Sequence, residues 1–546
     1  MMKSKKWVAM VSAAALSAGA LAGCSSGEPA KQGADNTPAG AAAPQPPINM
    51  TGFPIAKEPI TIKMMGAKGP LHGEWKDMLV FKEYEKMTGI KVEFETVPQN
   101  GFVEKRNVKM AGGDLPDAFY RAQFTPADEV NYGSQGILIP LNGLIDKYAP
   151  NLKAVMEKYP EVRQSITAPD GNIYTLPQLN DQLAPRLSRK IFINKKWLDK
   201  LGLPVPATTE EYYNTLKAFR DNDMTGSGKK DALPWSGDKT FDILSNIRGS
   251  WGLGTTGATG DSFIDKGPDG KLRFFAIDPK YKELLEYLNK LYKEGLIDKD
   301  VFTQEVPQFS AKLTQGITGS FSASNVNQAG AKYMDDYVPL PALKGPYGDQ
   351  LFSTVVPFTQ TQGTFAITNK NKYPEATMRW VDYFYGDEGV KFLRMGMEGV
   401  TYEKTPDGSD IQYKEEIRAN PKLSLDQAAA QFSPWPGGGI PQFVQMKYDK
   451  TGNTLPSSLE SAKVLGPYVP KEIWPKFLFT KDEQDQLNSL NNDINTYVQE
   501  QQIKFVTGAV PFSNWDQYVA SIKKMGVDKM LTIYGAAYDR YVKAKK

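Results

Sequence analysis

The chain has 546 residues, with 65 Lys and Arg against 62 Asp and Glu, one Cys and one His. This length exceeds a single ordinary core and predicts more than one domain, while 40% hydrophobic and 23% charged residues are typical of a globular protein. One Cys excludes an internal disulfide or a CxxC site, and one His excludes a two-histidine metal motif. A net charge of +3 gives no support for a nucleic-acid-binding surface.

The first residues have the layout of a secretory signal peptide, which we place at residues 1–23. Lysines precede an apolar, Ala-rich run from Trp7 to Ala22 that is too short to span a membrane. The run ends in Leu-Ala-Gly-Cys24, which resembles the lipobox of bacterial lipoproteins. The resemblance implies cleavage before Cys24 and lipidation of its thiol; the alternative is a chance Cys beside an ordinary cleavage site.

A low-complexity segment follows the lipidated Cys. Residues 24–56 are rich in Ser, Gly, Ala, Pro and Gln, a composition that predicts a disordered, flexible tether. The excess of basic residues lies in the signal peptide, so residues 24–546 carry equal numbers of basic and acidic side chains. We therefore expect an extracytoplasmic domain, residues 57–546, held at the cell membrane by lipid.

Strands and helices alternate at the start of this domain. Extended runs at Ile60–Met65, Lys91–Val97 and Asp117–Tyr120 are separated by helical patterns at Glu74–Met87 and Phe102–Met110. The alternation predicts βαβ units and a parallel sheet, whose ligands bind beyond the carboxyl ends of the strands.

Helical patterns dominate further along the chain. Apolar residues recur at helical spacing over Tyr281–Tyr292 and Leu487–Val498, and we interpret both as core-facing stripes. Two extended runs, Asp170–Pro177 and Gly363–Thr368, interrupt the helical regions. We interpret them as crossings between two lobes.

Several segments, in order over nearly all of residues 57–546, resemble the bacterial extracellular solute-binding proteins (family 1) of ABC importers. The resemblance is strongest to LipO-type lipoproteins of Gram-positive bacteria and to alginate-oligosaccharide-binding proteins. The segments are Ala111–Asp117, Gly136–Asn142, Leu144–Pro150, Asp170–Pro177, Ile193–Gly202, Tyr292–Asp298, Arg379–Tyr385, Phe505–Gly508 and Ala537–Tyr541.

The resemblance implies an α/β, two-lobed periplasmic-binding-protein fold with the ligand in a cleft between the lobes. We place lobe 1 at about 57–177 plus 363–450 and lobe 2 at about 178–362 plus 451–546. The implied partners are an oligosaccharide, the permease subunits of an ABC transporter and, through the lipid anchor, the membrane. We expect a monomer at the extracytoplasmic face, on a Gram-positive cell surface, and no nucleic acid.

A sugar site needs planar aromatic side chains for stacking and amide or carboxylate groups for hydrogen bonding. Trp235, Trp251 and Trp435 lie beside Gly, Pro and polar residues, so we interpret them as ligand platforms, against packing under a loop. Trp197 and Trp380, inside amphipathic helical patterns, are interpreted as core.

The polar candidates follow predicted strands or crossings. Tyr120 and Arg121 follow a strand and should reach the cleft. Gln178, Asn180 and Asp181 follow the first predicted crossing, and Asn325 lies where the family has a ligand-facing loop. The alternative for each is a role in a turn or a helix cap.

The segment Asp223–Asp231 resembles the family's calcium loop. Asp223, Thr225, Ser227, Lys229 (through its carbonyl) and Asp231 occupy the ligand positions, and Gly228 makes the sharp turn. Two carboxylates with neutral hydroxyls make a poor calcium cage, so we favour a metal-free turn over structural calcium and expect no other cofactor. We expect His72 to be an exposed loop residue, the alternative being a place in the cleft.

These observations predict a carbohydrate receptor of an ABC importer and not an enzyme. Two alternatives remain open. A lipid-anchored glycoside hydrolase would need two carboxylates about 5–10 Å apart, which a chain with 62 acidic residues cannot exclude; a polysaccharide lyase belongs to the same class. A non-transporting surface sensor could share the fold.

Overall fold

The computed structural model describes residues 48–239, 243–258, 263–420, 422–450 and 454–544. The predicted signal peptide, Cys24 and the tether as far as residue 47 lie outside the described residues. The compact unit considered below is Pro46–Lys546. None of the described helices is both long and apolar enough to cross a membrane.

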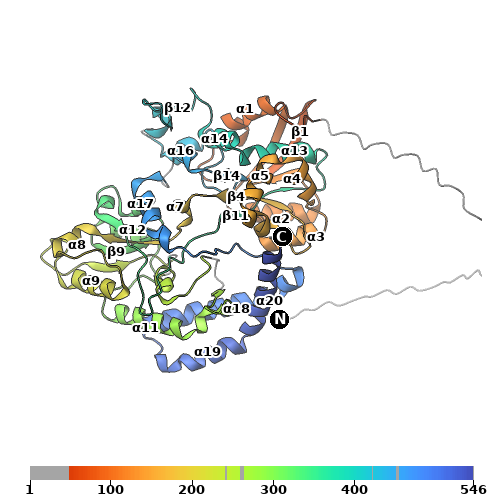
Figure 1. Ribbon diagram of the computed structural model, residues 1–546. Coiled ribbons are helices and arrows are strands. Elements are labelled where there is room, and N and C mark those ends of the chain that lie inside the picture. Colours follow the sequence, from red (N-terminus) through yellow and green to blue (C-terminus); the bar gives the residue numbers. More distant parts are fainter. Residues whose placement is uncertain (1–47, 240–242, 259–262, 421, 451–453, 545–546) are drawn as a thin grey trace, which may run out of the picture. The chain divides into compact units, whose positions relative to one another are not determined.

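A six-stranded sheet forms the first lobe (Figure 1). The sheet is mixed: at one side of it β1 pairs in parallel with both β2 and β3, which confirms the parallel pairing predicted for these three strands. β11 runs antiparallel between β3 and β4, and β14 pairs in parallel with β4. The strands, in spatial order, are β14 (Gln442–Val444), β4 (Thr175–Asn180), β11 (Thr359–Ile367), β3 (Ala118–Tyr120), β1 (Ile60–Lys68) and β2 (Ile90–Pro98).

This strand order gathers the carboxyl ends of β1, β3, β4 and β14 at one edge of the sheet, because these strands are all parallel to one another. Helices cover both faces, and their apolar sides form one core with the sheet. They are α1 (Leu79–Thr88), α2 (Phe102–Gly112), α3 (Pro126–Ser134), α4 (Asn142–Tyr148), α5 (Pro150–Lys158), α6 (Pro160–Ile166), α13 (Pro374–Asp382) and α14 (Asp387–Met395).

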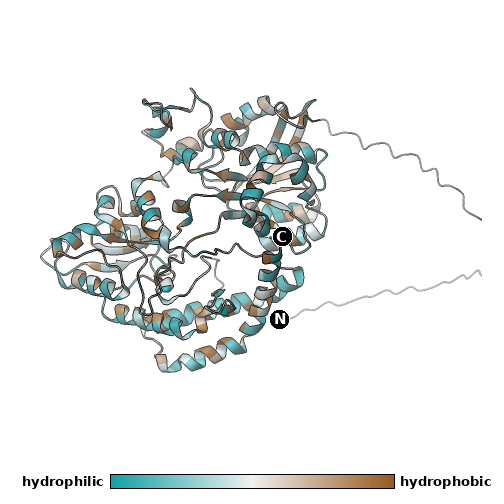
Figure 2. Ribbon diagram, in the orientation of Figure 1, coloured by the Kyte–Doolittle hydropathy of each residue, from teal (hydrophilic) through white to brown (hydrophobic). Residues whose placement is uncertain are grey.

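A four-stranded sheet forms the second lobe, with the order β10 (Tyr337–Pro339), β5 (Lys190–Asn194), β9 (Thr318–Ala323) and β6 (Leu233–Ser236). Apolar side chains of this sheet and of the helices of this lobe form the core of the second lobe. These are α8 (Lys195–Leu201), α9 (Thr209–Asp221), α10 (Ile243–Ile247), α11 (Pro279–Lys293), α12 (Val306–Thr314), α18 (Lys481–Thr507), α19 (Trp515–Lys524) and α20 (Val527–Lys543). Figure 2 shows helices with hydrophobic (brown) residues on one side and hydrophilic (teal) residues on the other, as expected for helices that pack on a core.

Short elements fill the connections. They include two hairpins, β7 (Ile264–Lys266) with β8 (Leu272–Phe274) and β12 (Tyr402–Lys404) with β13 (Ile411–Tyr413). The short helices are α7 (Leu183–Arg186), α15 (Glu415–Arg418), α16 (Leu425–Ala429) and α17 (Pro456–Leu465).

The segments interpreted as crossings lie within the first sheet, as parts of β4 and β11. The chain leaves this sheet after β4, enters the second sheet at β5, and returns to the first sheet at β11 after completing the second sheet with β10. At the C-terminal side, α20 touches α6, and Gln164 Nε2 donates to the carbonyl of Tyr541 over 3.2 Å. The two lobes are therefore joined by the chain segments after β4 and before β11 and by the contact between α6 and α20.

Two expectations differ from the structure. The helix predicted at Glu74–Met87 begins only at Leu79, because Trp75 is fully buried in a separate 3-10 turn and Met78 is extended. The end of the predicted tether also packs on the first lobe: Ile48 pairs with Ala56, and Ile48 and Ile55 are buried in its core. Their apolar side chains explain why order begins before residue 57.

Candidate functional site

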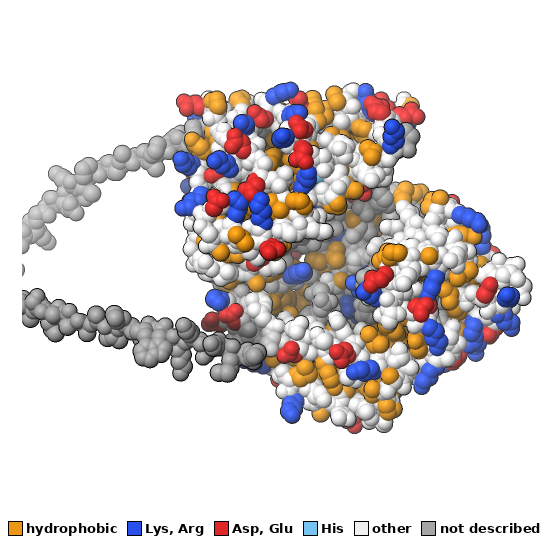
Figure 3. Space-filling model, turned by 180° about the vertical axis from the view of Figure 1, so that it is seen from behind, with side chains coloured by type: hydrophobic (Ala, Val, Ile, Leu, Met, Phe, Trp, Pro, Cys, Tyr) orange, Lys and Arg blue, Asp and Glu red, His pale blue; other side chains and the backbone are white. Residues whose placement is uncertain are grey.

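A cavity of about 550 Å³ lies between the facing edges of the two sheets. The first lobe lines it with the end of β4, the start of β11 and residues from 394 to 449. The second lobe contributes the start of β5 and the loop after β9. The surface is hollowed between the lobes in the view of Figure 3. This is the place at which a parallel sheet binds ligands, beyond the carboxyl ends of its strands.

Four amide side chains, here called the amide row, cross the first-lobe wall of this cavity. They are Gln178, Asn180, Gln360 and Gln442. Gln178 and Gln442 are register partners on β4 and β14, so their side chains share one face of the sheet. Gln178 Nε2 donates to Gln360 Oε1 over 2.8 Å, and Asn180 Nδ2 lies 3.3 Å from the same oxygen.

Gln442 differs from the other amides because neither its nitrogen nor its oxygen has a hydrogen-bond partner among the described residues, although the residue is fully buried. An unpaired buried amide costs free energy, about 1–3 kcal/mol from mutational data. A cavity-lining amide with both functions free is suited to a ligand hydroxyl, which can donate to the oxygen and accept from the nitrogen.

A glycine loop, Trp435–Gly439, forms the adjoining wall. Its three glycines have φ values of 82°, 65° and 73°, a left-handed run that side chains with a Cβ adopt rarely. Two contacts hold the loop on the sheet: Gly439 N donates to Gln178 Oε1 over 2.8 Å, and Arg121 Nη2 donates to Gly437 O over 3.2 Å. The loop thus brings bare backbone to the cavity.

His72 contacts the backbone of the glycine loop. Only 7% of the residue is exposed, so the expectation of an exposed loop residue is wrong. Its Nε2 lies 2.8 Å from the carbonyl of Pro436. Its Nδ1 accepts from Trp75 Nε1 and from the Gly69 backbone, both at 3.2 Å. Because Nδ1 accepts and Nε2 donates, the ring is neutral. Burial lowers the pKa of His72 to about 4, although the hydrogen bond to Pro436 opposes this shift.

Charged side chains occupy both walls of the cavity. Arg394 and Asp449 form a buried ion pair with 3.1 Å between Nη2 and Oδ1, and the Arg394 guanidinium lies 4.3 Å from the centre of the Trp435 ring. Burial and the neighbouring Asp449 raise the pKa of Asp426. On the second-lobe wall, burial lowers the pKa of Lys190 to about 8.

The structure brings four of the residues selected from sequence to this cavity: Gln178, Asn180, Asn325 and Trp435. The Oδ1 of Asn325 also accepts from the Asn327 backbone over 3.1 Å. Only 5% of Trp435 is exposed, since Arg394 covers one face of its ring. Their role in binding stays a prediction.

The other selected residues lie elsewhere. Arg121 is buried beneath the glycine loop, Tyr120 is fully buried in the first-lobe core, and Asp181 is exposed after β4. Trp235 is fully buried and donates to Ser322 Oγ over 3.2 Å, and Trp251 is 3% exposed against Tyr287. Trp235 lies within β6 and Trp251 at the end of a 3-10 helix, and both side chains belong to the second-lobe core, so their Gly and Pro neighbours did not indicate cleft loops.

The sequence reasoning missed Lys190, Gln360, Arg394, Gln442 and Asp449. One signal was present for Lys190, a charged residue at the start of the apolar strand Lys190–Asn194. The others come together only in the folded chain: Gln360 and Gln442 through strand pairing, and Arg394 and Asp449 through their ion pair.

The Asp223–Asp231 loop closes on its own hydrogen bonds. Asp223 accepts from the Gly226 and Gly228 backbone over 2.8 and 2.9 Å. Asp231 accepts from the Thr225 and Ser227 hydroxyls over 2.6 and 2.8 Å. No group of three or more His, Cys, Asp or Glu that could hold a metal occurs among the described residues. Two carboxylates already bonded to loop donors do not fit the oxygen-rich coordination of calcium.

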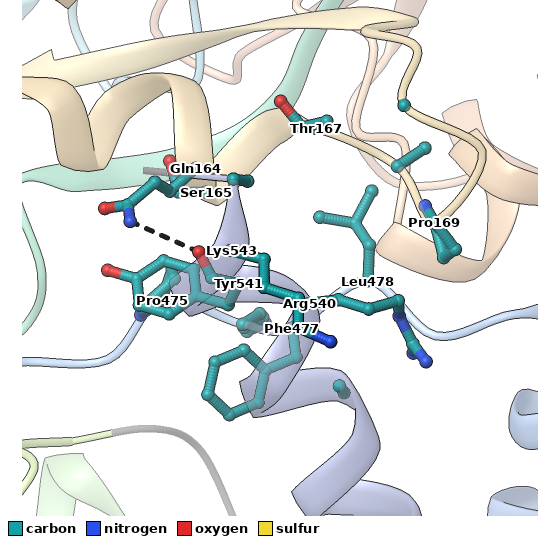
Figure 4. Close-up of a pocket in the computed structure, with 15 residues that line it drawn as sticks. Gln164, Ser165, Thr167, Pro169, Pro475, Phe477, Leu478, Arg540, Tyr541 and Lys543 are labelled. Carbon is teal, nitrogen blue, oxygen red and sulfur yellow. Dashed lines mark hydrogen bonds between the residues drawn. The ribbon is translucent and has the colours of Figure 1, made fainter. Parts of the chain in front are cut away.

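A second cavity, of about 320 Å³, lies where the first lobe meets α20 (Figure 4). Gln164, Pro475 and Tyr541 line it, and its labelled side chains come from α6, the residues directly after α6, the 475–478 segment and α20. It shares no lining residue with the first cavity and lies at a contact that joins the two lobes.

The comparisons with known proteins agree on one family. Residues 69–391, more than half of the chain, match the model of the bacterial extracellular solute-binding proteins. The chain is 28% identical to the fructooligosaccharide ABC transporter substrate-binding protein FusA of Streptococcus pneumoniae, over 93% of this chain and 95% of FusA. It is 23% identical to lipoprotein LipO of Bacillus subtilis, over 82% and 86% of the two chains.

Solved structures give the same result. FusA in complex with kestose superimposes with a TM-score of 0.70 at 27% identity, covering 89% of this chain and all of FusA. The alginate-binding protein AlgQ2 superimposes with a TM-score of 0.64 at 26% identity, covering 89% of this chain and 99% of AlgQ2. The two-lobed fold and the resemblances predicted from sequence are confirmed, and the chain belongs to the bacterial extracellular solute-binding protein family.

Proposed function

We propose that this protein captures an oligosaccharide outside the membrane and delivers it to the permease of an ABC transporter. The observation that carries the proposal is the unpaired amide of Gln442 within an amide row, in a cavity between two lobes. Amides, a Trp edge and bare glycine backbone match the hydroxyls and apolar faces of a sugar.

The ligands named for the relatives support an oligosaccharide, since FusA is a fructooligosaccharide-binding protein and AlgQ2 an alginate-binding protein. A cavity of about 550 Å³ has the size of a small-molecule site. Hinge closure of the two lobes would surround the sugar, as in other two-lobed binding proteins. In this proposal the protein binds the sugar without turning it over.

We further propose that Cys24 carries the lipid that holds the receptor at the extracytoplasmic face of a Gram-positive membrane. The lipobox-like residues before Cys24 and the likeness to lipoprotein LipO support this step. More than one acyl chain gives stable membrane anchoring. We propose a monomeric receptor with no cofactor and a metal-free Asp223–Asp231 loop.

A glycan panel tests the proposal by thermal unfolding and by analysis of the sugar afterwards. We expect one oligosaccharide class to raise the Tm and to be recovered intact. Gln442→Ala should weaken binding roughly tenfold, the loss of one good hydrogen bond, while Gln445→Ala, just beyond the same strand, should not. Steady release of reducing sugar would instead indicate a hydrolase, and absence of any glycan binding would refute the receptor.

A further inference from the structure

We propose that the second-lobe wall of the cavity holds an anion subsite built on Lys190, and that the ligand is an oligosaccharide carrying carboxylate groups. The inference rests on the proposed function, because it assigns a chemical class to the same cavity. It starts from a cation that the described part of the protein leaves without a counter-charge.

Lys190 is the first residue of β5, opposite Ala323 at the end of β9. Its side chain is 4% exposed and lines the cavity. The ammonium group donates to the carbonyl of Leu187 over 2.6 Å, at the end of α7. An ammonium group has three N–H donors, so this bond leaves two of them for other partners.

No carboxylate among the described residues forms an ion pair with Lys190. Burial alone lowers the pKa of its ammonium group, to about 8, and no acidic side chain in the described ranges acts against that shift. The ammonium therefore stays mostly protonated at neutral pH. Buried charges in proteins are normally paired, since an unpaired one is costly.

On the opposite wall, by contrast, a buried cation has a carboxylate partner. Arg394 is buried in the same cavity and pairs with Asp449 at 3.1 Å. Arg121, behind the glycine loop, resembles Lys190: it contacts the Gly437 carbonyl and Gln99 Oε1, and burial lowers its pKa without help from a carboxylate of the described chain. Two buried cations near the cavity thus lack a carboxylate partner within the part of the chain that the structure describes.

A carboxylate on the ligand would supply the missing counter-charge at Lys190, in a charge-assisted hydrogen bond. The neutral amide row across the cavity would take the sugar hydroxyls. Asn325 and Ser188, beside Lys190 in the cavity lining, offer further polar groups to the same end of the ligand. This division of polar groups suits a uronic-acid oligosaccharide.

Pairs of sugars with the same ring backbone, one with carboxylates and one without their charge, test the subsite. The probes are oligogalacturonate against its methyl ester, and oligomannuronate against mannooligosaccharide, with affinity measured by calorimetry. We expect an acidic member to bind at least tenfold more tightly than its neutral partner, and its affinity to fall with added salt.

Variants assign the effect to the side chain. Lys190→Met, which keeps the apolar stem, should abolish the preference for the acidic sugar, and Lys190→Arg should retain it. Lys344→Met, at an exposed lysine of the same lobe outside the cavity lining, should leave the preference unchanged. The unliganded Tm of each variant monitors folding.

The outcomes separate the two proposals. Tight binding of neutral sugars with no preference for acidic ones refutes the anion subsite and leaves the receptor proposal standing. Equal weakening of acidic and neutral sugars in Lys190→Met would instead make Lys190 a contact between the closed lobes, which also refutes the subsite. If no glycan binds, both proposals fail.

Discussion

Replacing His72 with Asn tests how the glycine loop is held on the first sheet. An Asn amide can place its oxygen near the position of Nδ1 and accept from Trp75 and Gly69, but it is too short to reach Pro436. The lost bond spans 2.8 Å and is buried. Leaving a buried carbonyl unpaired costs about 1–3 kcal/mol, so the free energy of unfolding at pH 7 should fall by that amount.

The pH dependence makes this prediction specific to the ring. The pKa of His72 is about 4 in the folded protein and 6.5 in an unfolded chain. The unfolded state therefore binds the proton more readily, and stability is lost as the pH falls from about 6.5 to about 4. That difference in pKa corresponds to roughly 3 kcal/mol, because one pKa unit is worth about 1.4 kcal/mol.

Urea unfolding from pH 7.5 to pH 4.5, followed by Trp fluorescence, measures both effects. The advantage of the unsubstituted protein over His72→Asn should shrink steadily as the pH falls, since all other titrating groups are shared. His72→Gln, whose longer amide can donate to Pro436, should keep part of the stability at pH 7 and also lack the extra pH dependence. Parallel pH profiles for the unsubstituted protein and the His72→Asn variant would refute the assignment of a neutral, buried ring.

Two further predictions concern the second lobe. Asp265 is fully buried and accepts from Arg273 Nε and the Gly254 backbone, both over 2.7 Å. Asp265→Ala should lower the free energy of unfolding by about 1–3 kcal/mol, because it leaves the buried Gly254 N–H without an acceptor, while Arg273 keeps its ion pair with Asp278 at 2.9 Å. Asp269→Ala in the neighbouring turn is the control, and equal effects would contradict the argument. The Tm should be the same in calcium and in EDTA, because an ion raises the Tm only if it binds the folded protein, and we expect the Asp223–Asp231 loop to bind none. A rise of the Tm in calcium that Asp231→Ala removes would show instead that this loop binds the ion.

The alternation of strands and helices could be predicted because it is local. Apolar residues at period two mark β1 and β2, and the structure places both strands within a few residues of the prediction. The helix at Glu74–Met87 failed at its start for a long-range reason. Trp75 fits the helical pattern, yet its ring packs edge-on against Phe94 and Tyr120, on two strands that follow its own segment.

The candidate site divides in the same way. Gln178 and Asn180 could be selected because polar side chains at the carboxyl end of a strand face a cleft. Trp235 and Trp251 could not be told from Trp435, because Gly and Pro neighbours do not show whether a Trp side chain packs into the core. Gln442 could not be selected from sequence, because it comes to the site only through the pairing of β14 with β4, in which it is the register partner of Gln178.

The distribution of polar groups between the two walls suggests how the anion subsite would act on selectivity. The amide row is neutral and belongs to the first lobe, whereas Lys190 belongs to the second. A neutral sugar can therefore satisfy the first wall, but it leaves the already buried Lys190 ammonium group without a counter-charge, at an electrostatic cost. An acidic sugar removes that cost by pairing with the ammonium group. The protein would thus distinguish acidic from neutral sugars when the lobes close. The preference for acidic sugars should therefore appear in the stability of the closed complex more than in the rate of first binding.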